Sequence, residues 1–344
     1  MSGRPRMIPA SPLPAQNPFP REEDWRRLWR ASIREPAALL ASLGLESLAA
    51  RIAPGQAGFP LRVPASFVAR MRHGDAHDPL LRQVLPLDEE LRIAPGFALD
   101  AVGDGAAKAG RGVIHKYEGR ALLIATGSCA IHCRYCFRRH FPYAEETAAS
   151  DGWQPALDAL RGDPSITEVI LSGGDPLSLS TAKLGELTEA LAGIEQLRRL
   201  RIHTRLPVAL PERVDAALSQ WLGGIPLQKI VVLHANHGNE IDAAVTRACA
   251  DLRASGAHLL NQAVLLRGVN DSVEALAELS EKLFAAGVLP YYLHQLDRVV
   301  GAAHFEVPDS RARELVDAVR ARLPGYLVPR LVREVAGEAA KQPL

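Results

Sequence analysis

The chain has 344 residues, 23% of them charged and 47% hydrophobic, and its formal net charge is +1. This length is enough for a large core, arranged as one barrel-sized domain or as two ordinary domains. The small net charge gives no reason to expect nucleic acid or a membrane surface as a partner. No apolar run approaches the roughly 20 residues that span a bilayer, and the N-terminus lacks an apolar signal core. We therefore expect a cytoplasmic protein.

The first third of the chain is predicted to lie outside the main fold. Residues 1–20 are rich in proline and polar side chains, which is typical of a loose arm. Residues 21–112 carry apolar residues at helical spacing, followed by short segments broken by proline and glycine. We interpret residues 21–112 as a helical accessory region.

From residue 113 to about residue 325, short apolar runs alternate with amphipathic segments. This alternation is typical of the α/β class, in which helices cover a parallel sheet. The predicted strands are ALLIATG, EVILSGG, LRRLRIHT, QKIVVLHA, AHLLNQAVLL and LPYYLHQLD, and the predicted helices lie near residues 153–161, 181–193, 212–222, 240–255, 272–286 and 309–322.

Six such units, with polar residues gathered at the strand ends, favour a partial (β/α)6 barrel over a flat doubly wound sheet. In either arrangement, ligands bind at the carboxyl ends of the strands. No G-x-G-x-x-G follows the first predicted strand, so a dinucleotide-binding fold has little support. Residues 326–344 are predicted to form a short C-terminal segment outside the barrel.

Three cysteines, Cys129, Cys133 and Cys136, lie in the segment CAIHCRYC, directly after the first predicted strand. A cluster of four irons needs four ligands, so three thiolates leave one iron open to bind and activate a small molecule. We therefore interpret the spacing C-x3-C-x2-C as the site of a [4Fe–4S] cluster. A zinc site completed by His132 or His140 is the alternative, since structural zinc takes four protein ligands.

The cysteine spacing resembles the signature of the radical S-adenosylmethionine (SAM) family. In that family the open iron is chelated by SAM, and an electron from the cluster cleaves the sulfonium to release a 5′-deoxyadenosyl radical. Tyr135 matches the aromatic residue before the third cysteine. Gly173, Gly174 and Asp175 end the second predicted strand and resemble the glycine-rich motif that contacts the methionine amino group. Glycines allow close backbone approach, and carbonyls accept hydrogen bonds from an ammonium.

Other segments resemble a narrower family, the lysine 2,3-aminomutases. They are HKYEGRALL, CRYCFRRHF, LSGGDPL, LHANHGNEI, LNQAVLLRGVNDS and PYYLHQLD, and the resemblance covers about residues 60–344. Members of that family are isomerases that move an amino group between adjacent carbons. The resemblance implies a partial barrel of the radical SAM type and three cofactors: the [4Fe–4S] cluster, SAM, and pyridoxal 5′-phosphate (PLP), which carries the nitrogen.

The resemblance also implies which residues bind PLP. Lys341, in VAGEAAKQPL, matches the family's catalytic lysine, which bonds covalently to PLP. A phosphate group needs cations and hydrogen-bond donors. Tyr117 and Arg120 match family positions that contact PLP, and Arg134 is a further candidate for the phosphate.

Polar residues at later strand ends resemble contacts to SAM. They are His234, Asn236 and Gln262, and each is alternatively a satisfied polar group at the rim of the barrel. His203 and Arg205, after the third predicted strand, are expected to face the same cavity.

A lysine substrate needs a guanidinium for its carboxylate and an acid for its remote ammonium. Arg138 matches the family's carboxylate-binding arginine, and Asp297 matches one of the two acids that hold the ε-ammonium. The second acid is expected seven residues before the PLP lysine, where this chain has Glu334. Family members that act on free lysine have aspartate there, and the additional methylene of glutamate changes which substrate fits.

Two features separate this chain from the aminomutases of lysine catabolism. It ends three residues after Lys341, without the C-terminal extension that helps those enzymes oligomerise, although this leaves a homo-oligomer open. In addition, FRRHFPYAE, IHTRLPV, YYLHQLDRVVGAAHF and GYLVPRLVREVAGE resemble the bacterial enzymes that make (R)-β-lysine for elongation factor P. Our hypothesis is therefore an L-lysine 2,3-aminomutase whose product a ligase attaches to that factor.

This hypothesis implies lysine as the small-molecule substrate, a flavodoxin or ferredoxin type reductant, and a functional link to elongation factor P and its ligase. One alternative is a free-lysine or glutamate 2,3-aminomutase of another pathway. Glutamate would not need a paired acidic pocket, which favours a cationic substrate. An alternative of another class is a zinc-binding structural protein without catalytic activity.

Overall fold

The strands form one ten-stranded sheet in the computed structural model, which describes residues 22–54, 59–148 and 152–344. The strands follow one another across the sheet in the order of the chain. The predicted arm over residues 1–20 lies outside the described residues. The strands are β1 (Lys108–Gly110), β2 (Val113–Tyr117), β3 (Arg120–Thr126), β4 (Glu168–Gly173), β5 (Arg199–Thr204), β6 (Gln228–Leu233), β7 (His258–Val264), β8 (Leu289–His294), β9 (Arg330–Arg333) and β10 (Gln342–Pro343).

Strands β3 to β9 run parallel to their neighbours, whereas β1, β2 and β10 are antiparallel additions at the two ends of the sheet. The predicted α/β class with a central sheet is confirmed, and all six predicted strands are present. The C-terminal segment predicted for residues 326–344 carries β9 and β10, which extend the same sheet. Likewise β1, at residues 108–110, already pairs with the sheet before the predicted start at residue 113.

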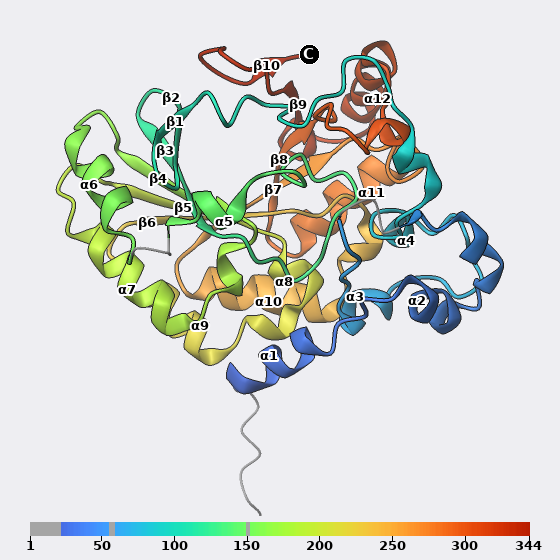
Figure 1. Ribbon diagram of the computed structural model, residues 1–344, viewed down its shortest axis with the longest axis horizontal. Helices are drawn as coiled ribbons and strands as arrows, with labels where there is room; N and C mark the ends of the chain where they lie inside the picture. The colour runs from blue at the N-terminus through green and yellow to red at the C-terminus, as the bar shows by residue number, and fades with distance from the viewer. Residues whose placement is uncertain (1–21, 55–58, 149–151) are drawn as a thin grey trace, which may run out of the picture.

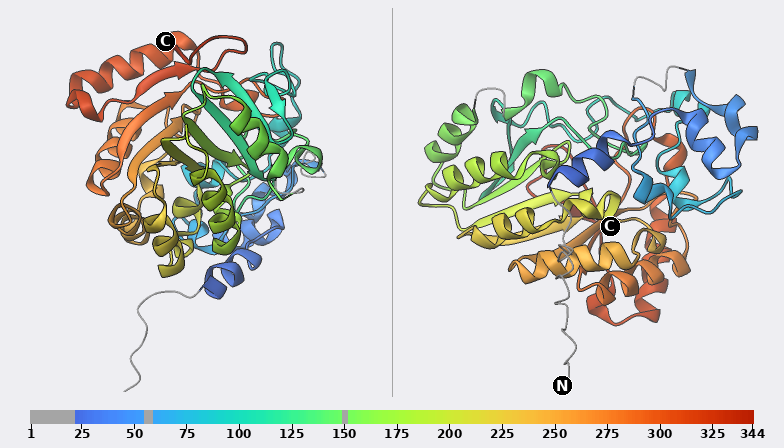
Figure 2. Two further views of the ribbon diagram at one scale, coloured as in Figure 1. Left: turned by 90° about the vertical axis from the view of Figure 1, so that its left-hand side faces the viewer. Right: turned by 90° about the horizontal axis from the view of Figure 1, so that it is seen from below.

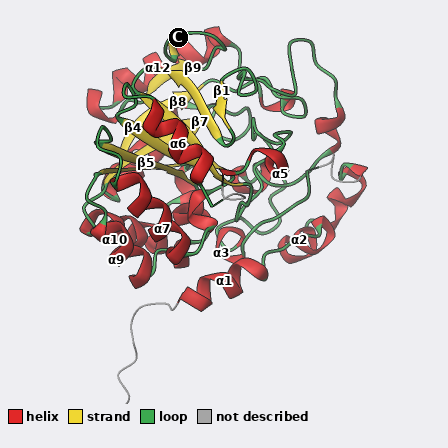
Figure 3. Cartoon of the chain, turned by 60° about the vertical axis from the view of Figure 1, so that its left-hand side comes forward, coloured by secondary structure: helices red, strands yellow, loops and turns green. Residues whose placement is uncertain are grey.

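Helices lie between successive parallel strands and cover the outer face of the sheet (Figures 1 and 3). Several begin at a side chain that accepts a backbone N–H, as Asp215 does from Leu218 and Ser272 from Ala275. All six predicted helices are confirmed. They are α6 (Gln154–Gly162), α7 (Thr181–Ala192), α9 (Ala216–Gly224), α10 (Ala243–Ala254), α11 (Val273–Ala285) and α12 (Asp309–Arg322).

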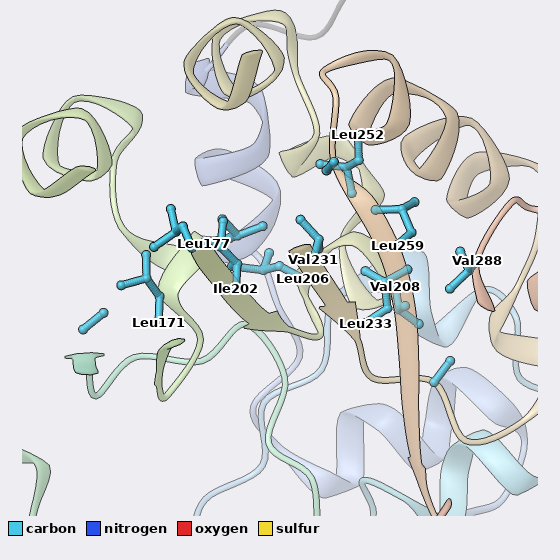
Figure 4. Packing of buried hydrophobic residues seen from close by; sticks show 14 of the residues in the cluster. Leu171, Leu177, Ile202, Leu206, Val208, Val231, Leu233, Leu252, Leu259 and Val288 are labelled. Atoms are coloured by element: carbon cyan, nitrogen blue, oxygen red, sulfur yellow. The ribbon is translucent and has the colours of Figure 1, made fainter. Parts of the chain in front are cut away.

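The main core lies between these helices and the sheet. Figure 4 shows strand residues such as Leu171, Ile202 and Val231 packed together, with Leu252 of α10 lying over Leu259 of β7. Strand β7 alternates buried and partly exposed residues, so one of its faces belongs to this core and the other faces inward. The inward face is therefore free to carry polar groups.

The accessory region packs against the loop that carries the cysteines. A second apolar cluster, separate from the main core, joins Leu40 and Phe67 of this region to Ile131, which lies between the first two cysteines. The region lies to one side of the sheet in Figures 1 and 2 (blue). Its helices are α1 (Glu22–Arg30), α2 (Pro36–Leu43), α3 (Ala65–Val68) and α4 (Pro79–Arg82), and two further short helices, α5 (Tyr143–Glu146) and α8 (Leu206–Ala209), follow strands of the sheet.

No helix in the described ranges is long and apolar enough to cross a bilayer.

Candidate active site

The cysteine loop begins where β3 ends, and the end of β4 holds it in place. The N–H of Gly174 donates to the carbonyl of Thr126 at 2.6 Å, and the N–H of Asp175 donates to that of Ser128 at 2.7 Å. A Cβ atom at Gly174 would lie 2.4 Å from the Ser128 oxygen, and one at Gly173 would lie 2.5 Å from the Thr126 oxygen. Gly173 also has a φ of +114°, which favours glycine. The two glycines are therefore required by the close approach of two backbones.

A cavity of about 390 Å³ opens at the carboxyl ends of the strands. It brings together residues that are as far apart in the chain as Tyr117 and Lys341. Most of the predicted site residues line it: Tyr117, Arg120, Cys129, Cys133, Cys136, Arg138, Gly173, Gly174, Asp175, His234, Gln262, Asp297, Glu334 and Lys341.

The three cysteine thiols line this cavity and influence one another. Burial, together with the neighbouring Cys133 sulfur, raises the pKa of Cys136 to about 11, and burial raises that of Cys129 as well. Thiols in such surroundings become thiolates when a metal binds them. Three thiolates that line one cavity would bind an iron–sulfur cluster and leave one iron open, so the donor set fits a cluster.

A chain of ion pairs links five residues that line the same cavity. The Arg138 guanidinium donates to Asp104 at 2.7 Å, and Lys116 contacts the second Asp104 oxygen at 2.7 Å. Lys116 also lies 3.4 Å from Glu334, which in turn pairs with the ammonium of Lys341. The predicted carboxylate-binding and ammonium-binding groups are thus connected through two residues that the sequence did not single out.

The two predicted acids have opposite protonation tendencies. Burial would raise the pKa of Glu334, but the ammonium groups of Lys341 and Lys116 outweigh it and hold this pKa at about 2. Burial and the negative charge of Glu334 raise the pKa of Asp297 to about 7. Near neutral pH, Glu334 is therefore ionised, whereas Asp297 exchanges a proton with its surroundings.

The residues near Lys341 fit PLP. Lys341 presents a primary amine to the cavity, and Arg120 lies with its guanidinium carbon 4.7 Å from the ring centre of Tyr117. Arg120 lines the cavity, where its guanidinium can bind a phosphate. Asp175 differs, since its carboxylate already accepts from the N–H groups of Leu177 and Arg205, so its side chain orders the strand ends.

Two predicted cofactor contacts do not reach the cavity. Arg134 is fully buried on the far side of the cysteine loop, where its guanidinium pairs with both oxygens of Glu90, so it is a structural residue and its assignment to phosphate is wrong. Asn236 is also buried, and its amide donates to the Tyr135 hydroxyl at 2.7 Å and to Gln83 at 2.9 Å. It does not line the cavity, which contradicts its assignment to SAM.

Sequence reasoning missed several polar residues that line the cavity. Asp104 and Lys116 precede the first predicted strand, in a stretch without periodicity, and no signal in the sequence places them opposite Arg138. His294 lies within a predicted strand, and its ring is buried, which lowers its pKa to about 3. The expectation that His203 and Arg205 face the cavity is confirmed.

We expect Gly174→Ala to impair assembly of the cluster, because its new methyl group would displace the Ser128 carbonyl and with it Cys129. The iron content after anaerobic reconstitution should fall to less than half that of the unmodified protein. Gly185→Ala in α7 is a matched control, since nothing lies within 4 Å of its Cβ position, and it should keep its iron. Equal iron in both variants would show that the close approach does not position the thiols.

Comparisons with known proteins agree with this site. No protein-family model matches the chain. An "L-lysine 2,3-aminomutase" of Escherichia coli is 46% identical over 327 residues, which are 94% of this chain and 95% of the relative. The same name belongs to a Haemophilus influenzae protein with 44% identity over 96% and 98% of the two chains. A longer Clostridium subterminale relative is 36% identical over 78% of this chain and 65% of its own. The chain therefore belongs to the L-lysine 2,3-aminomutase family of isomerases.

Proposed function

We propose that this chain is a cytoplasmic L-lysine 2,3-aminomutase that converts (S)-α-lysine to (R)-β-lysine. We also propose that its sheet and the covering helices form a partial barrel of the radical SAM type. The observation that carries the proposal is the composition of one cavity. Three cysteine thiols, a guanidinium, two acids and an amine line it together. A lysine molecule has the complementary groups.

The cofactors of this family are a [4Fe–4S] cluster, SAM and PLP. When bound, they supply an adenosyl radical and a temporary covalent attachment for the migrating nitrogen. Cys129, Cys133 and Cys136 would hold the cluster, and Lys341 would bond to PLP. Tyr117 and the guanidinium of Arg120 would hold PLP in place.

The protein residues bind the two ends of the substrate. Arg138, which is 7% exposed, offers its guanidinium to the substrate carboxylate, which then competes with Asp104 for it. Asp297 and Glu334 offer two carboxylates to the ε-ammonium. A glutamate substrate would instead bring a carboxylate to these acids, and like charges repel. The acid pair therefore favours lysine over glutamate.

Before substrate binds, Glu334 pairs with the amine of Lys341 and so orients its nitrogen within the cavity. Glu334 has a pKa of about 2 and stays ionised near neutral pH. Once Lys341 is bonded to PLP, the Glu334 carboxylate would be available, together with Asp297, to the ε-ammonium of the substrate.

We further propose that the product serves the β-lysylation of elongation factor P and that a flavodoxin or ferredoxin type protein supplies the electron. The first proposal rests on the resemblance of the segments around Arg138 and Glu334 to enzymes of that modification. The second rests on the requirement of the cluster for a one-electron donor. A free-lysine aminomutase of another pathway would have the same chemistry, and only the fate of the product separates the two.

We expect anaerobically reconstituted protein, supplied with SAM, PLP and dithionite, to convert L-lysine to (R)-β-lysine. Chiral chromatography of the product checks both the migration and its stereochemistry. Glutamate, and elongation factor P already carrying an attached α-lysine, are offered in parallel. Absence of β-lysine would refute the activity, and faster conversion of the attached lysine would show that modification precedes isomerisation.

Lys341→Ala should keep its iron, about four atoms per chain, and lose the visible absorbance of covalently bound PLP. The reason is that the substitution removes the amine of Lys341 and leaves the three cysteine thiols unchanged. Lys183→Ala, at an exposed position of α7, is the control and should keep both signals. If Lys341→Ala keeps the PLP absorbance, another lysine holds the cofactor.

The KM for lysine should fall about tenfold between pH 6 and pH 8. Below its pKa of about 7, Asp297 is protonated and attracts the ε-ammonium poorly, and above it the carboxylate is charged. Glu334 stays ionised throughout this range. Asp297→Asn should raise the KM and abolish its dependence on pH. A pH profile that is unchanged in this variant would assign the titration to another group.

A further inference from the structure

A buried arginine contacts a cluster-binding cysteine from outside the cluster's own ligand set. Nη1 of Arg205 donates to the Cys133 sulfur at 2.7 Å and to the Tyr135 hydroxyl at 2.8 Å. Nη2 of the same guanidinium donates to Glu240 at 2.9 Å and to the side-chain oxygen of Gln83 at 2.6 Å. The Arg205 guanidinium therefore connects the cysteine loop to the Glu240 carboxylate.

The surrounding structure fixes the guanidinium in this position. Arg205 directly follows β5, and the Asp175 carboxylate accepts its backbone N–H at 2.7 Å. Arg205 is 6% exposed, and neither Glu240 nor Gln83 has exposed surface. Both terminal nitrogens of the side chain are thus bonded to neighbouring groups, and the charge stays beside Cys133.

Two residues of the accessory region bind Glu240, whose carboxylate balances the charge of Arg205. Gln83, at the end of α4, donates to Glu240 at 3.0 Å, and the guanidinium of Arg70 donates to the Glu240 backbone carbonyl. Glu240 also accepts the N–H of Asn236 at 2.8 Å. Asn236, whose predicted contact with SAM is contradicted, therefore belongs to this network instead.

We propose that Arg205 raises the reduction potential of the cluster by donating to the Cys133 sulfur, and that Glu240 limits this effect. Reduction adds one electron from an external donor such as dithionite, and part of the new charge resides on the cysteine sulfurs. A cation and an N–H donor at such a sulfur stabilise the reduced state more than the oxidised state. The Glu240 carboxylate, on the other side of the Arg205 guanidinium, lowers the reduction potential. The low polarity of the buried surroundings strengthens both effects.

This inference rests on the cluster assigned under the proposed function, and it makes Arg205 a positioning residue that acts through Cys133. A purely structural ion pair between Arg205 and Glu240 predicts a different outcome. In that case loss of either partner would weaken the fold, and the two substitutions would not move the potential in opposite directions. The signs of the two shifts therefore separate the two roles.

The test is a redox titration of the reconstituted full-length protein with dithionite, followed by electron paramagnetic resonance of the reduced cluster. Arg205→Gln should lower the ratio of reduced to oxidised cluster at least tenfold at a fixed potential, which is about 59 mV for one electron. Glu240→Gln should shift the ratio in the opposite direction. Arg213→Gln is the matched control, since Arg213 is fully buried but bonds to the backbone carbonyl of Leu177, and it should leave the potential unchanged.

Two outcomes would overturn the inference: no shift in Arg205→Gln, or shifts of the same sign in both variants, at an iron content equal to that of the unmodified protein. If Arg205→Gln fails to assemble the cluster, Glu240→Gln decides alone, and an unchanged or lower potential in that variant would overturn the inference. An unmodified protein that holds its cluster but makes no β-lysine would refute the proposed function alone, because the comparison of potentials does not depend on turnover.

Discussion

The close approach of two backbones at the ends of β3 and β4 is the constraint on which the site depends. Because Gly173 and Gly174 have no side chains, the cysteine loop can lie directly on the end of β4. The next residue, Asp175, then binds the backbone N–H of Arg205 and so fixes the start of the segment after β5. One contact between neighbouring strands therefore positions both the thiols and the buried guanidinium beside them.

A second group of cavity residues is held in place by charge rather than by close packing. Arg138, Asp104, Lys116, Glu334 and Lys341 alternate in sign, so each ionised group has a partner before any substrate is present. Buried charges without partners are strongly destabilising, so this alternation keeps a polar interior compatible with a folded protein. A substrate with a carboxylate and an ammonium replaces the partners at both ends without leaving a charge unpaired.

The order of strands and helices could be predicted because apolar runs and amphipathic segments are properties of local sequence. The cysteines and Lys341 were found because their spacing or neighbours resemble a known family. Strand β9 was missed because only two of the four residues in RLVR are apolar. Arg134 was assigned wrongly because sequence proximity to the cysteines does not reveal on which side of their loop a side chain lies. Asp104 was missed because its partner Arg138 is 34 residues away and no local pattern around Asp104 points to that contact.

The tail that carries Lys341 pairs with the sheet through Gln342 with Arg333 and Pro343 with Val332, and the Leu344 N–H donates to the Leu331 carbonyl. The local opening of so short a strand costs far less than unfolding of the sheet. Lys341, the proposed PLP lysine, thus lies in a segment that can detach while the rest of the sheet stays folded. Substitutions in this tail can consequently alter cofactor retention while thermal stability and iron content remain unchanged, so measurements of folding alone would not detect a defective enzyme.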